Sequence, residues 1–186
     1  SASNSTTTAI NANPATPTIS TPTASVCTAS PGNTAQGPAG ATTYAWSITG
    51  GTITSAANLQ TVTYTAAAAG SVQLTLVVTN ASGCSATNSL VVPIDPLPTL
   101  LPATGASFTA TFNTLFSQAF TASGGTGPFT YTISPSTPPA GLAFAGGTLS
   151  GTPNATGTFT FTVTATSAVG CASTTQSYTL VVRPNL

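Results

Sequence analysis

Residues 158–166 read Thr-Phe-Thr-Phe-Thr-Val-Thr-Ala-Thr, an unbroken alternation of hydroxyl and apolar side chains. Successive side chains of a β-strand point to opposite faces, so a period of two predicts a half-buried strand. Phe159, Phe161, Val163 and Ala165 would then face a core, and the threonines would face solvent. Threonine and valine are also stiff at χ1, which suits strands better than helices. This stretch therefore predicts β-structure.

The same alternation recurs elsewhere, and no segment has a convincing helical period. Residues 72–78 alternate in the same way, with Val72, Leu74, Leu76 and Val78 predicted to face inward. Breaks rich in Gly, Pro and Asn separate the candidates every 8–12 residues or so, which indicates an all-β sandwich fold. The other candidate strands are Thr42–Ile48, Thr61–Thr65, Cys84–Val92, Phe116–Ala122, Phe129–Ile133 and Ser177–Val182.

An internal repeat indicates two such sandwiches. Val72–Cys84 recurs as Phe159–Cys171, and each copy is followed by a strand that ends in Leu-Val-Val. The period of about 90 residues is that of one immunoglobulin-like (Ig-like) sandwich. We therefore predict two tandem Ig-like β-sandwich domains, at residues 21–94 and 95–186, after an extended N-terminal arm at residues 1–20. The proline-rich stretch 93–98 would connect the domains.

Charge content excludes whole classes of function. The chain has one Lys or Arg, one Asp or Glu and no His, so 1% of its residues are charged, against about 25% in ordinary soluble domains. Nucleic-acid binding needs a basic surface, and metal sites need clustered His, Cys or carboxylates. No apolar run reaches the roughly 18 residues of a membrane-spanning helix. We expect no enzyme, no cofactor, no metal site, no nucleic-acid partner and no membrane span.

Motifs in both halves of the chain resemble known families of surface modules. Residues 24–94 resemble the PKD-like (Ig-like) modules of large bacterial cell-surface proteins, and residues 97–183 resemble the Ig domain found in bacterial adhesins and autotransporters. The motifs of the first half are Val26-Cys27, Gly32-Asn33-Thr34, Thr43–Gly51 and Asn80–Cys84, and those of the second half are Ala122–Phe129, Pro139–Leu142 and Leu149–Pro153. The resemblance implies an extracellular, Ig-like, non-catalytic module, used as a spacer, an adhesive arm or a surface repeat. It also places Trp46 in the core of the first sandwich.

The resemblance further suggests a disulfide between Cys27 and Cys84. Such a crosslink would contribute on the order of 4 kcal/mol through the chain entropy of the unfolded state, and an exported protein meets the oxidising conditions that it needs. Cys171 lacks an evident partner in its own half. Three alternatives stay open for Cys171: a buried free thiol, a disulfide between subunits, or pairing with Cys27.

Three asparagines lie in N-glycosylation sequons, namely Asn4, Asn80 and Asn154. Asn80 and Asn154 fall at predicted turns, where a covalent glycan could be accommodated. Threonine-rich strand faces are candidate O-linked acceptors as well.

The N-terminal arm suggests a mode of self-assembly. Thr16–Ile19 could form a first strand of the nearer sandwich, which leaves a polar segment long enough for one more strand. Exposed sheet edges accept such strands, and lysine or glutamate, which usually block edges, are absent. The candidate donor strand is Thr6, Thr7, Thr8, Ala9, Ile10 and Asn11. We therefore expect a structural subunit of an extracellular or cell-surface filament, with itself as partner; the alternative is an adhesin or glycan-binding spacer module of a larger surface protein.

Overall fold

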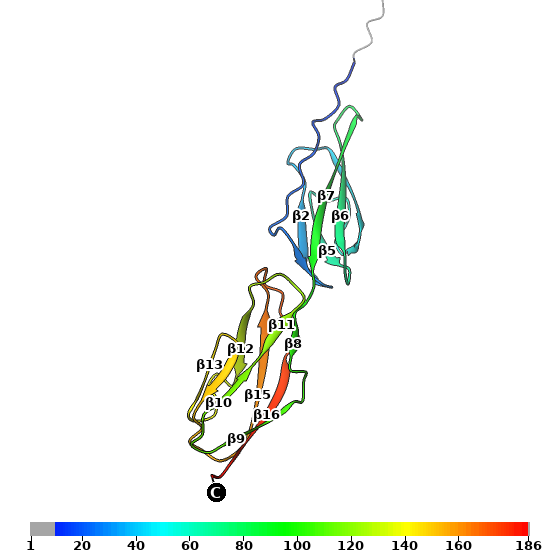
Figure 1. Ribbon diagram of the computed structural model, residues 1–186. Coiled ribbons are helices and arrows are strands. Elements are labelled where there is room, and N and C mark those ends of the chain that lie inside the picture. Colours follow the sequence, from blue (N-terminus) through cyan, green and yellow to red (C-terminus); the bar gives the residue numbers. More distant parts are fainter. Residues whose placement is uncertain (1–9, 186) are drawn as a thin grey trace, which may run out of the picture. The chain divides into compact units, whose positions relative to one another are not determined.

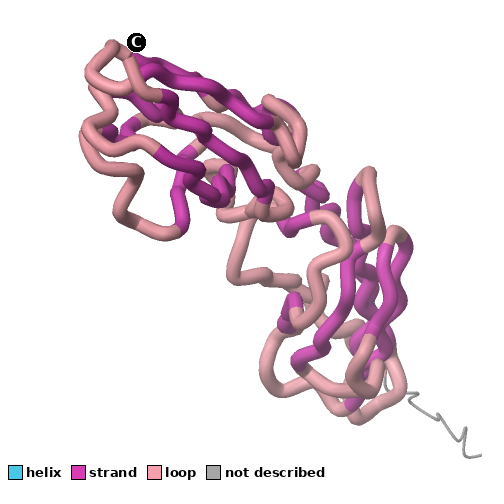
Figure 2. The backbone as a smooth tube through the Cα atoms, turned by 90° about the horizontal axis from the view of Figure 1, so that it is seen from below, coloured by secondary structure: helices cyan, strands magenta, loops and turns pink. Residues whose placement is uncertain are grey.

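The computed structural model of the protein describes residues 10–185, which form strands and loops without a helix (Figure 2). These residues group into two compact units, the first ending at Ile94 and the second beginning at Asp95 (Figure 1). Each unit is an Ig-like β-sandwich, so the predicted fold class is confirmed.

Unit 1 pairs a four-stranded sheet with a three-stranded sheet. The larger sheet has the order β1-β7-β6-β3 and the smaller one the order β2-β5-β4. The strands are β1 (Val26–Cys27), β2 (Asn33–Gln36), β3 (Thr43–Thr49), β4 (Gly51–Ile53), β5 (Thr61–Ala66), β6 (Ser71–Thr79) and β7 (Ser85–Asp95).

Unit 2 has a four-stranded sheet in the order β12-β15-β16-β9, a three-stranded sheet β10-β14-β13 and a short pair β11-β8. Strand β9 runs parallel to β16, whereas β12 and β16 each pair antiparallel with β15. The strands are β8 (Thr99–Leu101), β9 (Ser107–Thr111), β10 (Phe116–Ala119), β11 (Thr121–Ser123), β12 (Thr130–Ser134), β13 (Leu142–Ala145), β14 (Thr148–Gly151), β15 (Gly157–Thr166) and β16 (Gln176–Arg183).

The predicted inward faces form the two cores. On β6, the four predicted apolar residues at 72, 74, 76 and 78 are buried against Val62 and Tyr64 of the facing sheet. On β15, Phe161, Val163 and Ala165 are buried, and Phe159 packs against them at the edge of the core. Trp46 lies in the core of unit 1, as predicted, and its indole N–H donates to the Leu59 carbonyl at 2.9 Å.

Two predicted strands differ from the structure. The expected strand Phe116–Ala122 is divided between β10 and β11, because the Phe120 N–H donates outside both, to the Gly147 carbonyl at 2.7 Å. Thr16–Ile19 forms no strand; only Ser20 makes a bridge, to Gln36. Pro17 accounts for this second difference, because it has no N–H to donate to a ladder.

Glycines in the motifs of unit 2 are required by close backbone packing. Gly141 has φ of +86°, and a Cβ there would collide with the Thr152 carbonyl. That carbonyl is close because the Thr152 N–H donates to the Gly141 carbonyl at 3.0 Å. The two motifs Pro139–Leu142 and Leu149–Pro153 therefore pack against each other without side chains between them.

Replacing Tyr64 by phenylalanine is expected to stabilise unit 1. The Tyr64 hydroxyl is buried without a hydrogen-bond partner, and burial raises the pKa of Tyr64. Removing an orphaned buried hydroxyl should raise the free energy of unfolding by about 1 kcal/mol. The matched control is Tyr178→Phe, which loses a hydrogen bond to the Pro102 carbonyl at 2.7 Å and should cost about 1 kcal/mol. Amide hydrogen exchange would measure the change in unfolding free energy for both variants. Equal destabilisation by the two would contradict the claim that the Tyr64 hydroxyl has no hydrogen-bond partner.

Candidate assembly surface on the first unit

The N-terminal arm (residues 10–20) runs beside β7 without forming a ladder with it. Side chains hold the arm instead: Asn80 donates to the Ala12 carbonyl at 2.9 Å, and Asn88 donates to the Pro17 carbonyl at 2.9 Å. The Cys84 thiol lies 3.7 Å from the Asn11 carbonyl oxygen. The first half of β7 therefore borders an irregular segment, whereas the equivalent last strand of unit 2, β16, has a parallel partner in β9 from Thr179 to Arg183.

Sequence reasoning missed the asparagines that hold the arm. Asparagine is uncommon within strands, so Asn88 in the middle of a predicted strand was the available signal. Asn80 also closes its own turn, since its side-chain oxygen accepts from the N–H groups of Ser82 and Cys84 at 3.0 Å each.

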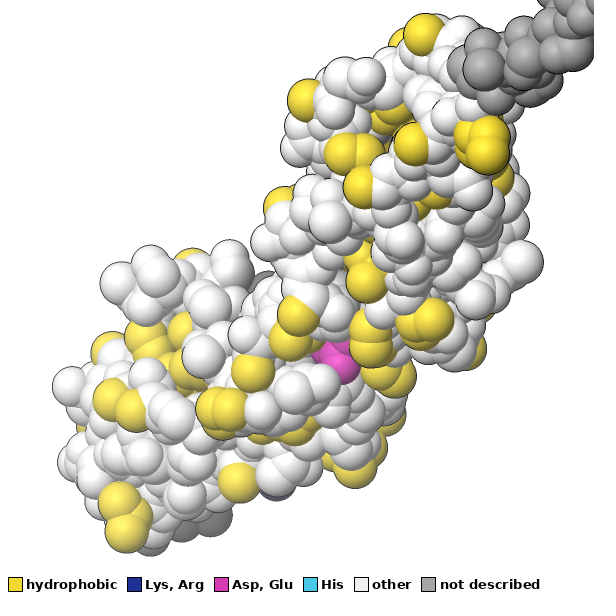
Figure 3. Space-filling model, turned by 90° about the horizontal axis from the view of Figure 1, so that it is seen from above, with side chains coloured by type: hydrophobic (Ala, Val, Ile, Leu, Met, Phe, Trp, Pro, Cys, Tyr) yellow, Lys and Arg dark blue, Asp and Glu magenta, His cyan; other side chains and the backbone are white. Residues whose placement is uncertain are grey.

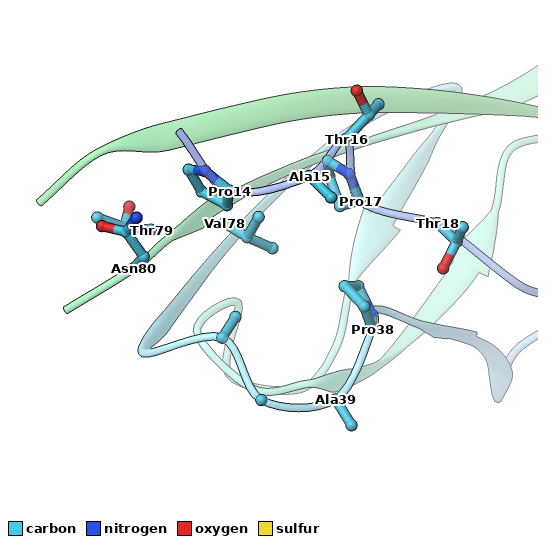
Figure 4. A pocket seen from close by; sticks show the side chains of 12 residues that line it. Pro14, Ala15, Thr16, Pro17, Thr18, Pro38, Ala39, Val78, Thr79 and Asn80 are labelled. Carbon is cyan, nitrogen blue, oxygen red and sulfur yellow. The ribbon is translucent and has the colours of Figure 1, made fainter. Parts of the chain in front are cut away.

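A pocket of about 360 Å³ lies between the arm and the loop of residues 38–41. Figure 4 shows Pro14 and Pro17 on the arm and Pro38 on the opposite loop, with Val78 of β6 between them. Pro17 is fully buried. The arm forms one wall of this pocket. The walls are mainly proline rings and methyl groups, and they carry no ionisable group.

The candidate donor strand falls only partly within the described residues. Thr6, Thr7, Thr8 and Ala9 lie outside them. Ile10 and Asn11 are described and belong to no strand. The Ile10 side chain is 96% exposed, so it makes almost no use of the core of its own unit.

The surface is almost uncharged. Figure 3 shows mainly uncharged polar and apolar side chains around one acidic side chain, that of Asp95, the only acidic residue in the sequence. Within the described residues, no group of three or more His, Cys, Asp or Glu side chains could hold a metal ion. Nor is any helix in residues 10–185 suited to cross a membrane.

The predicted pairing of Cys27 with Cys84 is wrong. Cys27 and Cys171 are each disulfide-bonded, whereas Cys84 is a free, partly exposed thiol. The free-thiol alternative for Cys171 is therefore wrong as well.

Distance along the sheet explains the error. Cys84 adjoins the β6–β7 register pair Thr79 and Ser85. Two residues after Cys27, the Ala29 N–H donates to the Ala67 carbonyl, and Ala67 precedes the pair Ser71 and Pro93 at the other end of the ladder. These ends are about 27 Å apart at strand spacing, and a disulfide needs Cα atoms within about 7 Å.

The sequons occupy different environments. Asn154 is exposed on the segment between β14 and β15, where a glycan would meet solvent. The Asn80 amide nitrogen already donates to the arm, and Asn4 lies outside the described residues. Glycosylation of these asparagines stays a prediction.

Comparisons with known proteins agree with an Ig-like module. The family described as Putative Ig domain matches residues 98–183. No curated protein sequence matches the chain.

Three solved structures illustrate the similarity in fold. Extracellular domains 3–5 of Drosophila OTK are 14% identical, with a TM-score of 0.49, over 86% of this chain and 58% of that one. The fibronectin(III)-like modules of Clostridium thermocellum CbhA are 18% identical, with a TM-score of 0.43, over 90% and 94%. An I-band fragment from titin is 14% identical, with a TM-score of 0.45, over 91% and 66%. The chain thus spans less than two thirds of the OTK and titin fragments. Ig-like domains and disulfides are typical of extracellular proteins.

Proposed function

We propose that this chain is a structural subunit of an extracellular or cell-surface filament, in which residues 6–11 of one copy add to a sheet of the next. The exposure of Ile10 carries the proposal. A large apolar side chain that is 96% exposed gains about 2 kcal/mol when another surface buries it.

The way the arm is held supports this function. From Ala12 to Pro17 it is fixed on unit 1 by side-chain hydrogen bonds and proline contacts. This anchor would transmit tension from a docked strand into the sandwich. Just before this anchor, the Ile10 side chain is almost fully exposed and could therefore be buried by a neighbour.

The lack of charge supports assembly as well. With one basic and one acidic residue, little electrostatic repulsion opposes close contact between copies. Charged side chains on sheet edges are the usual protection against edge-to-edge pairing. Their near absence leaves the edges of this chain open to strand addition.

The alternative function is an adhesin or glycan-binding spacer of a larger surface protein, with unit 1 of the PKD-like type. The open pocket beside Pro14, Pro17 and Pro38 favours it, since that pocket could seat a small neutral ligand. Under either function the chain has no catalytic role and is located outside the cell. Covalent glycans at Asn4, Asn80 or Asn154 are compatible with both functions.

Deleting residues 1–10 tests the filament function. The deletion leaves the hydrogen bonds to Ala12 and Pro17 intact, so unit 1 should keep its fold while polymers disappear from electron micrographs. Ile10→Asp should weaken association at least about 30-fold, because it loses roughly 2 kcal/mol of apolar burial and desolvates a charge. Ile10→Val is the matched control and should still polymerise. Undiminished filaments from the deleted chain would refute the function.

A further inference from the structure

One half of β15 lacks a strand neighbour on one side. Strand β16 pairs with residues 157–163 of β15, but β12 pairs only with residues 162–166. Residues 157–161, called here the β15 edge, therefore have a partner on one side alone. None of the turn and loop backbone hydrogen bonds of the described residues involves these five positions. On the side of β12, this edge is thus unpaired over about 16 Å.

The loop that leaves β12 cannot close this edge itself. After Ser134 the chain leaves the ladder, and its residues 135–140 include Pro135, Pro138 and Pro139. These prolines have no N–H to donate. A cavity of about 390 Å³ separates the loop from the β15 edge, with the rings of Phe159 and Phe161 on its far side.

We propose that the β15 edge accepts residues 6–11 of a second copy of this chain, an inference that rests on the proposed function. Unpaired strand edges are templates for an added strand, whose main chain supplies the hydrogen bonds and whose alternate side chains fill pockets. The six-residue donor matches the five-residue edge in length.

The side chains of donor and cavity are complementary. In an extended donor, Thr6, Thr8 and Ile10 share one face. Ile10 would enter the cavity between the proline loop and Phe159, which is apolar and only partly covered in unit 2. Neither the donor nor the lining of the cavity carries a charge, so nothing charged is desolvated when the strand docks.

Disulfide trapping between separate chains tests the acceptor. Cys84→Ser first removes the free thiol. Chains with Ala9→Cys in this background are then mixed with chains carrying Thr158→Cys or Thr160→Cys, two exposed positions on the β15 edge. Because each chain carries only one of the two new thiols, a bond between them must join two copies. The control acceptor is Thr109→Cys, equally exposed on β9 at the opposite edge of the same sheet.

The mixture with the β15-edge cysteines should give at least about tenfold more of the mixed disulfide than the Thr109→Cys control, because a docked strand holds the thiols at millimolar effective concentration. Mass spectrometry of the linked peptides gives the yield. Filaments that form with no excess over the control would overturn the β15 edge as acceptor and leave the filament function standing. If the parent chain forms no filaments and the mixed variant chains give no excess of the mixed disulfide, both the acceptor and the filament function are overturned.

Discussion

Replacing Phe120 by alanine is expected to lower the free energy of unfolding of unit 2 by about 3–5 kcal/mol. Phe120 is 2% exposed and is the centre of an aromatic cluster. Its ring centroid lies 4.9 Å from that of Tyr178, and Phe108, Phe144 and Phe161 lie at 6.0–6.1 Å. Edge-to-face pairs add about 0.5–1.5 kcal/mol each beyond area burial, so the variant loses packing from both sheets at once.

Amide hydrogen exchange in the intact chain would measure this loss separately for each unit. Protection should fall in unit 2 and stay unchanged in unit 1, because Phe120 belongs to the core of unit 2 alone. Leu115→Ala is the matched control, since Leu115 is 80% exposed and its truncation should change stability by less than about 0.5 kcal/mol. An equal loss from both variants would show that the cluster does not determine the stability of the unit.

Periodicity was a reliable guide where one face of a strand is buried. The alternation at residues 158–166 and 72–78 places the same side chains inward in the structure as in the sequence, because any one-residue slip would expose the whole apolar set. Strand β9, with five residues that alternate in the same way, was not predicted. The short strands β1, β2, β4, β8, β13 and β14 were not predicted either. With two to four residues each, they are too brief to show a period.

Positions that depend on three-dimensional distance could not be predicted. The family resemblance offered Cys84 as the partner of Cys27, but nothing in the sequence reveals that the two residues lie at opposite ends of β7. The unpaired edge of β15 could not be predicted for the same reason. It arises from where β12 ends relative to β15, and register between distant strands is set by packing rather than by local sequence.

The N-terminal arm shows a third limit of prediction from the sequence. Pro14 and Pro17 favour an extended arm, which the structure has, but they also exclude the ladder expected for Thr16–Ile19. The side-chain bonds from Asn80 and Asn88 replace that ladder. Local propensity alone could not identify carbonyls about 70 residues away as their acceptors.

Replacing Asp95 by asparagine is expected to destabilise unit 2 by about 2–3 kcal/mol. Asp95 is 6% exposed, and its two carboxylate oxygens accept from the Thr126 hydroxyl at 2.6 Å and the Ser167 hydroxyl at 2.9 Å. Hydrogen bonds to a charged group are worth about 1.5–3 kcal/mol. An amide offers one oxygen in place of two, so one hydroxyl would face an N–H donor. Thr126→Val is the narrower variant, since it removes one hydroxyl and keeps the carboxylate.

The same carboxylate predicts how stability depends on pH. Burial alone would raise the pKa of Asp95, but the hydroxyls of Thr126 and Ser167 and the backbone of Thr126 hold it below its ordinary value. A carboxyl with a lowered folded pKa stabilises the fold above its unfolded pKa of about 3.9 and loses that contribution as the pH falls through the folded value. Because no histidine is present, unfolding free energy should be flat from about pH 5 to 8 and should fall below about pH 4. In the Asp95→Asn chain, the unfolding free energy of unit 2 should no longer fall below about pH 4. Two results would contradict the role of Asp95 in this pH dependence. One is a parent chain whose stability changes sharply near pH 6, and the other is a variant whose unfolding free energy still falls fully at low pH.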